Sequence, residues 1–288
     1  MQFIPEVTLG HYHGLEVWQV QTASATAVIS VFGGQLLSYV PAGQPDLLWL
    51  SPTLAALPTP IRGGVPVCWP WFGRQGQGSD VPAHGRVRTA RWQLLQAQRL
   101  LGSQVLLELA PSVDADPRLR LSLQLRIGAQ LQQRLTTTNA GDTPVTFTQA
   151  LHSYFRVGDA TRVEVDGVDG LHYLNKYEDY ASLHLQQGPW RLRDPRDPGR
   201  SDRIYPGTSG HHVLRDPVLQ RRIDIRSEGS QTLVAWNPGA AAAAQMADVG
   251  DAWRDYVCLE VANAGPEQIV LAPGAIHAMS QMLSSVPL

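Results

Sequence analysis

Short alternating or apolar runs, separated by Gly, Pro, Asn and Asp, recur along most of the chain. They cover residues 15–20, 25–31, 35–40, 105–109, 118–127, 132–138, 145–155, 221–226, 232–236, 256–261 and 268–271. Runs of this length, rich in leucine and β-branched residues, are typical of strands in a sandwich or barrel. Helical signals are limited to a turn at 251–256 and a short stretch at 240–246, neither long enough to carry a core. The pattern therefore predicts an all-β fold with few short helices.

The same pattern bears on domain organisation. No shift in composition, Gly/Ser linker or repeat of fixed period divides the 288 residues, so we expect one domain over residues 1–288. A Pro- and Arg-rich stretch at 188–210 lies between strand-like segments. We predict a long surface loop there, and loops of that length in compact domains are usually functional or mobile.

Composition and charge narrow the classes of partner. The chain is 43% hydrophobic and 17% charged, as expected of a globular protein, and its formal net charge is −2. No global basic field is therefore available for nucleic acid or an anionic membrane, which favours a small-molecule partner. Cys68 and Cys258 are too few for a disulfide framework, and the first residues lack a basic segment followed by an apolar run. These features predict a cytoplasmic protein.

His152 is the first candidate for acid–base chemistry. In the run 145–155, apolar residues alternate with Thr146, Thr148, His152 and Tyr154, which places the imidazole on a polar face near the middle of a strand. An imidazole titrates near neutrality and can give or accept a proton there. A lone strand histidine is more often structural, so this signal needs a partner.

Glu260 interrupts an otherwise apolar strand at 256–263. Burial costs a carboxylate its solvation, so it must be paired, accept hydrogen bonds or have a raised pKa, as a general base does. A structural ion pair remains the alternative for this residue taken alone.

Two loop segments add candidate ligand contacts. Residues 60–73 combine glycines, prolines, Arg62 and three aromatic residues, so we expect close backbone approach to a ligand and flat apolar surface for a sugar ring. Residues 82–88 add His84 and Arg88, and Asp202 offers a carboxylate to a sugar hydroxyl. Solvated surface residues are the alternative for each.

Local histidine pairs raise the question of a metal. His11 with His13, and His211 with His212, lack a third ligand or a carboxylate at helical spacing, so we do not predict a metal site. No phosphate-binding loop, nucleophile elbow or dinucleotide fingerprint is present.

Taken in order, these segments resemble a known family. The blocks are Pro60 to Pro70, Pro82 to Gly85 with Arg88, Leu151 to Phe155, Asp202 to Tyr205 and Val257 to Glu260. They resemble the glucose-6-phosphate 1-epimerase (hexose-6-phosphate mutarotase) branch of the aldose 1-epimerase superfamily, from about Ala25 to the C-terminus.

The resemblance implies a galactose-mutarotase-like antiparallel β-sandwich, or supersandwich, with an open sugar cleft. By matching position, His152 is the family's general acid and Glu260 its general base, and we expect them on opposite sides of one pyranose. Arg62, Arg88 and Asp202 match substrate-contacting positions, and His84 matches the second active-site histidine. Ala83 and Arg86 depart from the family pattern: a glutamine often precedes the histidine, and Arg86 stands where an apolar residue is usual. These departures leave the sugar preference open.

The reaction implied is interconversion of the α and β anomers of a hexose 6-phosphate, glucose 6-phosphate first, by acid–base ring opening and closure. It needs no metal or other cofactor, and we expect a monomer whose partner is the sugar phosphate, with no nucleic acid or membrane. The rival readings are an aldose 1-epimerase acting on unphosphorylated hexoses and a non-catalytic carbohydrate-binding module.

Overall fold

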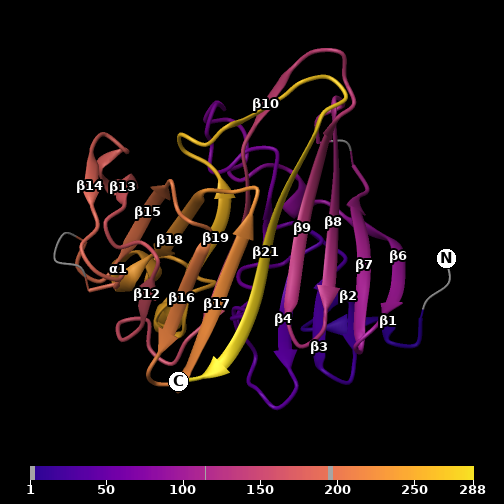
Figure 1. The fold of residues 1–288 in the computed structure, drawn as a ribbon, viewed down its shortest axis with the longest axis horizontal. Coiled ribbons are helices and arrows are strands. Elements are labelled where there is room, and N and C mark those ends of the chain that lie inside the picture. The colour runs from indigo at the N-terminus through magenta and orange to yellow at the C-terminus, as the bar shows by residue number, and fades with distance from the viewer. Residues whose placement is uncertain (1–3, 114, 194–196) are drawn as a thin grey trace.

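The structure is a computed structural model that describes residues 4–113, 115–193 and 197–288, and its regular elements are mostly strands of antiparallel sheets (Figure 1). The largest sheet has the strand order β12 (Glu164–Asp166), β16 (His211–Asp216), β17 (Arg221–Glu228), β21 (Ile276–Pro287), β9 (Leu131–Asn139), β8 (Leu119–Ile127), β7 (Gln104–Pro111) and β6 (Trp92–Leu100). This eight-stranded sheet forms one layer of the molecule.

The second large sheet has the order β14 (Leu183–Leu185), β13 (His172–Asn175), β15 (Ser201–Pro206), β18 (Thr232–Asn237), β19 (Tyr256–Asn263), β11 (Gln149–Arg156) and β5 (Val67–Cys68). Smaller sheets are formed by β1 (Val7–Tyr12), β2 (Leu15–Gln21), β3 (Ala25–Ser30) and β4 (Leu36–Pro41), and by β10 (Val145–Phe147) with β20 (Ile269–Leu271). The helical elements described are the α-helix α1 (Gly239–Ala243) and the 3₁₀ turns η1 (Val87–Thr89), η2 (Lys176–Glu178) and η3 (Gly250–Asp255).

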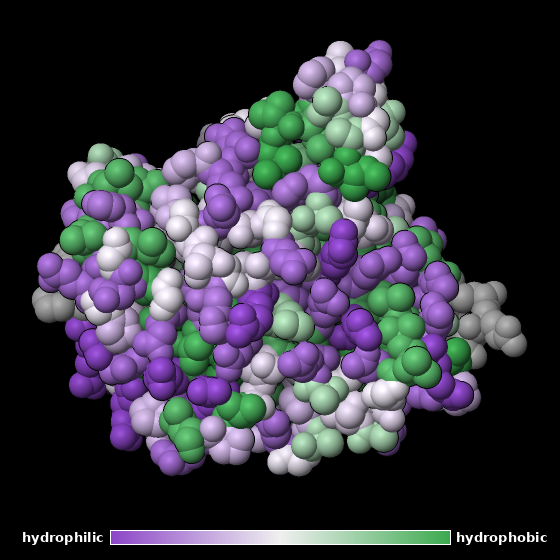
Figure 2. Space-filling view, viewed as in Figure 1, coloured by the Kyte–Doolittle hydropathy of each residue, from purple (hydrophilic) through white to green (hydrophobic). Residues whose placement is uncertain are grey.

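Alternation along the strands explains why the sheets stack. In β8 the leucines at alternate positions are buried, whereas Arg120 and Arg126 are exposed on the other face. The buried leucines join one large apolar cluster with residues of the seven-stranded and four-stranded sheets. Figure 2 shows the outer face as mostly hydrophilic, with apolar side chains in separate patches. The inner faces therefore form the core of a β-sandwich, and the all-β prediction is confirmed.

The predicted surface loop at 188–210 is wrong in its second half. β15 lies there, hydrogen-bonded between β13 and β18 in the interior of the seven-stranded sheet. Trp190 and Leu192 in the first half are buried as well. Part of the polarity of this stretch is buried as an ion pair: Arg203 is 1% exposed and its Nη2 lies 2.9 Å from Asp197 Oδ2.

Two further expectations need adjustment. The run at 145–155 is not one strand but two, because the chain leaves β10 at Thr148 and enters β11. The strands that lie outside the predicted runs are β1, β5, β6, β12, β13, β14, β15, β16 and β21. The two predicted helical stretches correspond to α1 and η3. No helix in the part of the chain described is long and apolar enough to cross a membrane.

Candidate active site

Strand register builds the floor of the site. The direct register partners across β11, β19, β18, β15 and β13 are His152, Glu260, Val234, Ile204 and Leu174. Register partners on neighbouring strands point to the same face of a sheet. All five line a cavity of about 880 Å³. The opposite face of β11, with Leu151 and Ser153, points into the sandwich, where Ser153 Oγ donates to Gln281 Oε1 of β21 at 3.0 Å.

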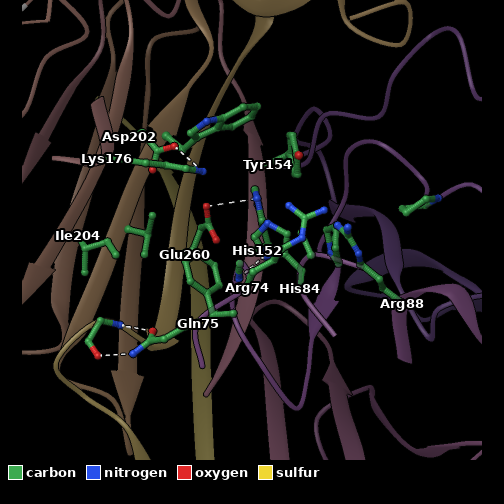
Figure 3. Close-up of a pocket in the computed structure, with 18 of the residues that line it drawn as sticks. Arg74, Gln75, His84, Arg88, His152, Tyr154, Lys176, Asp202, Ile204 and Glu260 are labelled. Carbon is green, nitrogen blue, oxygen red and sulfur yellow. Dashed lines mark hydrogen bonds and ion pairs between the residues drawn. The ribbon is translucent and has the colours of Figure 1, made fainter. Parts of the chain in front are cut away.

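The next row on the same face is aromatic and charged. It consists of Tyr154, Cys258, Trp236 and Asp202, again in direct register. Lys176 follows at the end of β13, and Figure 3 shows it beside Asp202 on one side of the catalytic candidates. Trp236 is only partly buried and lines the cavity, so it offers flat apolar surface to a sugar ring.

His152 and Glu260 touch each other. His152 Nε2 lies 3.3 Å from Glu260 Oε1, and the two residues are only 8% and 1% exposed (Figure 3). His152 Nδ1 and Glu260 Oε2 are buried and have no hydrogen-bond partner among the described residues. Buried polar atoms without partners are rare in folded proteins, and a hydroxyl-rich ligand can satisfy them.

Burial acts on the two groups in opposite directions. It lowers the pKa of His152 well below its ordinary value, and the neighbouring His84, Arg62 and Arg88 lower it further. It raises the pKa of Glu260 well above its ordinary value, and Asp202 adds to this effect. Both shifts favour the neutral forms, that is, a neutral imidazole beside a protonated carboxyl group.

His84 is held as a neutral hydrogen-bond donor. Its backbone is left-handed (φ 64°), and the Gly73 N–H donates to its Nδ1 at 3.2 Å. A neutral imidazole that accepts at Nδ1 carries its hydrogen on Nε2. Burial and the charge of Arg88 lower its pKa to about 3, so it stays neutral near pH 7. Its ring centroid lies 5.7 Å from that of His152.

The two candidate arginines differ in whether their side chains already make hydrogen bonds. Arg62 Nε donates to Asp248 Oδ2 at 2.9 Å, and its Nη1 donates to the Tyr154 hydroxyl at 3.1 Å. The Arg88 side chain has no hydrogen bond or ion pair to any described residue, and its Nε is buried without a partner. Arg88 therefore keeps its full donor capacity for an anionic ligand.

The Asp202 carboxylate already has a partner, so it is less available to a sugar hydroxyl than expected. Its Oδ2 lies 3.3 Å from Lys176 Nζ, and burial raises its pKa while Lys176 lowers it. Sequence reasoning missed Lys176 and Trp236. The signals were present: Lys176 is the only lysine of the chain, and alternation along 232–236 places Trp236 on the face of Val234.

Two of the three aromatic residues in the loop at 60–73 do not line the cavity, which differs from the prediction. Trp69 is buried between the sheets, where its Nε1 donates to Thr137 Oγ1 at 3.0 Å. Trp71 is buried too and donates to the Pro82 carbonyl at 2.9 Å. Of these three aromatic residues only Phe72 lines the cavity. Trp69 and Trp71 are therefore not available to a ligand in the cavity, whereas Phe72 and Trp236 line it.

Two glycines of this loop, Gly63 and Gly64, face neighbouring backbone, whereas Gly73 lines the cavity. A Cβ on Gly63 would lie 2.5 Å from the Trp49 carbonyl oxygen, and one on Gly64 2.2 Å from that of Leu36. The Gly64 carbonyl accepts the Tyr154 N–H at 2.9 Å. The two glycines thus let the loop approach the backbone of Trp49 and Leu36 closely while it pairs with β11, next to Arg62.

The two departures from the family pattern lie in different places. Ala83 lines the cavity and brings no side-chain hydrogen bond to it. Arg86 is exposed, does not line the cavity, and places its guanidinium 5.7 Å from the Trp71 ring centroid. Only Ala83 can therefore affect contact with a ligand directly.

The structure brings all six predicted site residues, His152, Glu260, Arg62, His84, Arg88 and Asp202, around one cavity. The expected arrangement of acid and base on opposite sides of the sugar is wrong. They are cross-strand neighbours on one floor. The histidine pairs do not line this cavity: His11 lies on β1, and His211 Nε2 lies 3.1 Å from Asp224 Oδ1 on the eight-stranded sheet.

Comparison with known proteins identifies the family. The aldose 1-epimerase family model matches residues 16–284. An Escherichia coli K12 protein named "Putative glucose-6-phosphate 1-epimerase" is 32% identical over 96% of this chain and 92% of its own length. A protein of that name from Cenchrus ciliaris is 29% identical over 91% of this chain and 82% of its own.

Solved structures agree. A crystal structure described as a "putative mutarotase (YeaD)" from Salmonella typhimurium matches with a TM-score of 0.88 at 28% identity, over 100% of this chain and 96% of that one. The mutarotase-like sandwich expected from the sequence is thereby confirmed. The cavity lies inside a fold that the family model covers almost from end to end, and the chain belongs to the aldose 1-epimerase family.

Proposed function

We propose that this protein is a hexose-6-phosphate 1-epimerase that interconverts the α and β anomers of glucose 6-phosphate. One observation carries the proposal: the His152–Glu260 contact lies in the same cavity as Arg88, a guanidinium without a partner among the described residues. The names of the relatives above support the same substrate.

The spacing of the pair suits ring opening. The reaction removes a proton from O1 and delivers one to O5, and both oxygens are bonded to C1. Two oxygens on one carbon lie about 2.3 Å apart, so groups 3.3 Å apart can each reach one of them. Adjacent placement on one floor therefore serves the reaction without the sugar lying between the two residues.

Binding of the substrate phosphate changes the charge around the His152–Glu260 pair. Arg62 and Arg88 are among the groups that lower the pKa of His152. A phosphate dianion bound to them offsets their charge, so the His152 pKa rises on substrate binding and the shared proton moves toward the imidazole. Glu260 is then a carboxylate and His152 an imidazolium.

The proposed chemistry consists of proton transfers and one bond cleavage. Glu260 takes the O1 proton while His152 donates to O5, so the C1–O5 bond breaks and C1 becomes an aldehyde. Rotation about C1–C2 presents the other face of the carbonyl to O5. Ring closure with the two roles reversed gives the opposite anomer and restores both residues.

Other cavity residues orient the sugar. His84 Nε2–H donates to the ring oxygen or a neighbouring hydroxyl, and Asp202 accepts from a hydroxyl. Trp236 packs on the apolar face of the ring. Arg88 binds the phosphate through forked, charge-assisted hydrogen bonds, and Arg62 adds its remaining N–H groups.

Exchange NMR at anomeric equilibrium tests the proposal. The exchange rate of the α and β signals is measured for glucose 6-phosphate and for glucose, with the spontaneous rate subtracted from each. We expect a much larger acceleration for the phosphorylated sugar. Equal acceleration of both would instead indicate an aldose 1-epimerase of unphosphorylated hexoses, and acceleration of neither would indicate a binding module.

A further inference from the structure

Tyr154 joins two parts of the site that the proposed reaction treats separately. Its ring stacks on His152, with centroids 4.8 Å apart and planes 8° from parallel. Its hydroxyl accepts a hydrogen bond from Arg62 Nη1 at 3.1 Å. One side chain therefore touches both the catalytic imidazole and a guanidinium assigned to the phosphate.

The position of Tyr154 is fixed by its surroundings. The side chain is 2% exposed and packs against Trp49 at 5.9 Å, Tyr256 at 5.1 Å and Trp236 at 6.2 Å between ring centroids. Its backbone N–H donates to Gly64, two residues from Arg62. A ring held on all these sides has little freedom to reorient.

Among the described residues, two groups hold the Arg62 side chain. Asp248 accepts from Nε, and the Tyr154 hydroxyl accepts from Nη1. These two contacts, on different nitrogen atoms of the planar guanidinium, fix its plane and leave the other N–H groups to an anion. Removal of the Tyr154 hydroxyl leaves Asp248 as a single anchor.

We propose that Tyr154 is a positioning residue with two separable roles: its hydroxyl orients Arg62 for the substrate phosphate, and its ring sets the plane of the His152 imidazole. The inference rests on the proposed function where it names the phosphate. It assigns no proton transfer to Tyr154.

Tyr154→Phe separates the two roles because it removes the hydroxyl and keeps the ring. Tyr256→Phe is the matched control: Tyr256 belongs to the same aromatic cluster, and its buried hydroxyl has no hydrogen-bond partner among the described residues. For both variants and the wild type, kcat and KM are measured on glucose 6-phosphate, and the Kd of inorganic phosphate by calorimetry.

We expect Tyr154→Phe to raise the KM for glucose 6-phosphate and the Kd for inorganic phosphate by about tenfold, as expected for loss of one hydrogen bond to a charged group. Its kcat should stay within about twofold of wild type, because the stacked ring remains. Tyr256→Phe should leave all three quantities unchanged.

Two results would overturn the assignment: wild-type phosphate affinity in Tyr154→Phe, or a loss of kcat as large as the rise in KM. The calorimetric measurement is independent of turnover. A wild-type protein that binds phosphate without exchanging anomers would contradict the proposed function and still test the role of the Tyr154 hydroxyl.

Discussion

Arg88 and Arg62 bear the same charge but have different surroundings. Arg62 already donates to Asp248 and Tyr154, whereas Arg88 has no partner among the described residues, and burial lowers its pKa. Holding an unpaired cation in a partly buried position costs free energy unless a ligand compensates it. Arg88 is therefore the residue from which the phosphate assignment draws most support.

Arg88→Ala should raise the KM for glucose 6-phosphate by about ten- to a hundredfold, because charge-assisted hydrogen bonds are lost, and should change the rate on glucose much less. Arg86→Ala is the control, since Arg86 lies two residues away and outside the cavity lining. Steady-state exchange kinetics on both sugars give the answer. Equal losses on the two sugars would argue against a phosphate contact.

Lys176 should control the pH at which Glu260 ionises. Burial and Asp202 raise the pKa of Glu260, and Lys176 lowers it. Without the ammonium group the Glu260 pKa rises further, and the carboxylate form appears only at higher pH. In Lys176→Met the acidic limb of the kcat/KM–pH profile should therefore move to higher pH, and Lys176→Arg should restore it. An unchanged limb in Lys176→Met would remove this role.

At the scale of elements, the sequence predicts the two faces of a strand where apolar and polar residues alternate along it. The pattern around His152 and Glu260 predicted both faces of β11 and β19, and the register then places them side by side. β15 was not predicted as a strand because Asp202 and Arg203 give its sequence a polar character. Their partners, Lys176 and Asp197, are distant in sequence or come from a loop, and such pairings cannot be inferred from strand periodicity.

The glycine pair beside β11 gives a test of how the site is assembled. Gly64→Ala combines a left-handed backbone (φ 60°) with a clash at 2.2 Å against Leu36. We expect it to lower the free energy of unfolding by about 3–5 kcal/mol. Gly43→Ala has a similar φ of 74° but open space around the added methyl group, so it should cost only about 1–2 kcal/mol. Chemical denaturation measures both, and equal losses would show that the close approach to Leu36 is unimportant.

At the scale of the whole molecule, the two large sheets have different roles. One face of the seven-stranded sheet forms the cavity floor, and its other face packs on the eight-stranded sheet. Beneath His152, Ser153 and Gln281 exchange hydrogen bonds, and Gln281 Nε2 donates to Gln133 Oε1 at 2.7 Å. Composition and alternation predicted the layers, but the sheet order depends on long-range pairings that the sequence does not display.

The distribution of charge also differs between the whole molecule and the cavity. The chain has a formal net charge of −2, yet four cationic residues line the cavity, Arg62, Arg74, Arg88 and Lys176, against three acidic ones, Asp202, Asp248 and Glu260. Because the Glu260 pKa is raised, the local balance is more positive than this comparison of four with three. A local positive field in a near-neutral protein favours a small anion over a polyanion.

The KM for glucose 6-phosphate should therefore rise by about two- to fivefold between about 0.01 M and about 0.15 M salt, as screening shortens the range of the field. The KM for glucose should stay constant over the same range, which makes glucose the control in a salt titration of the exchange kinetics. A KM for the phosphorylated sugar that is insensitive to salt would contradict the account of the cavity charge.

The most direct test of the central claim is the α–β exchange rate of glucose 6-phosphate, measured by exchange NMR with the wild type, His152→Ala and Glu260→Gln and corrected for spontaneous exchange. We expect each variant to lose about two to four orders of magnitude in rate while its thermal unfolding stays close to that of the wild type. Near-normal exchange in either folded variant would contradict the claim that this pair opens and closes the ring.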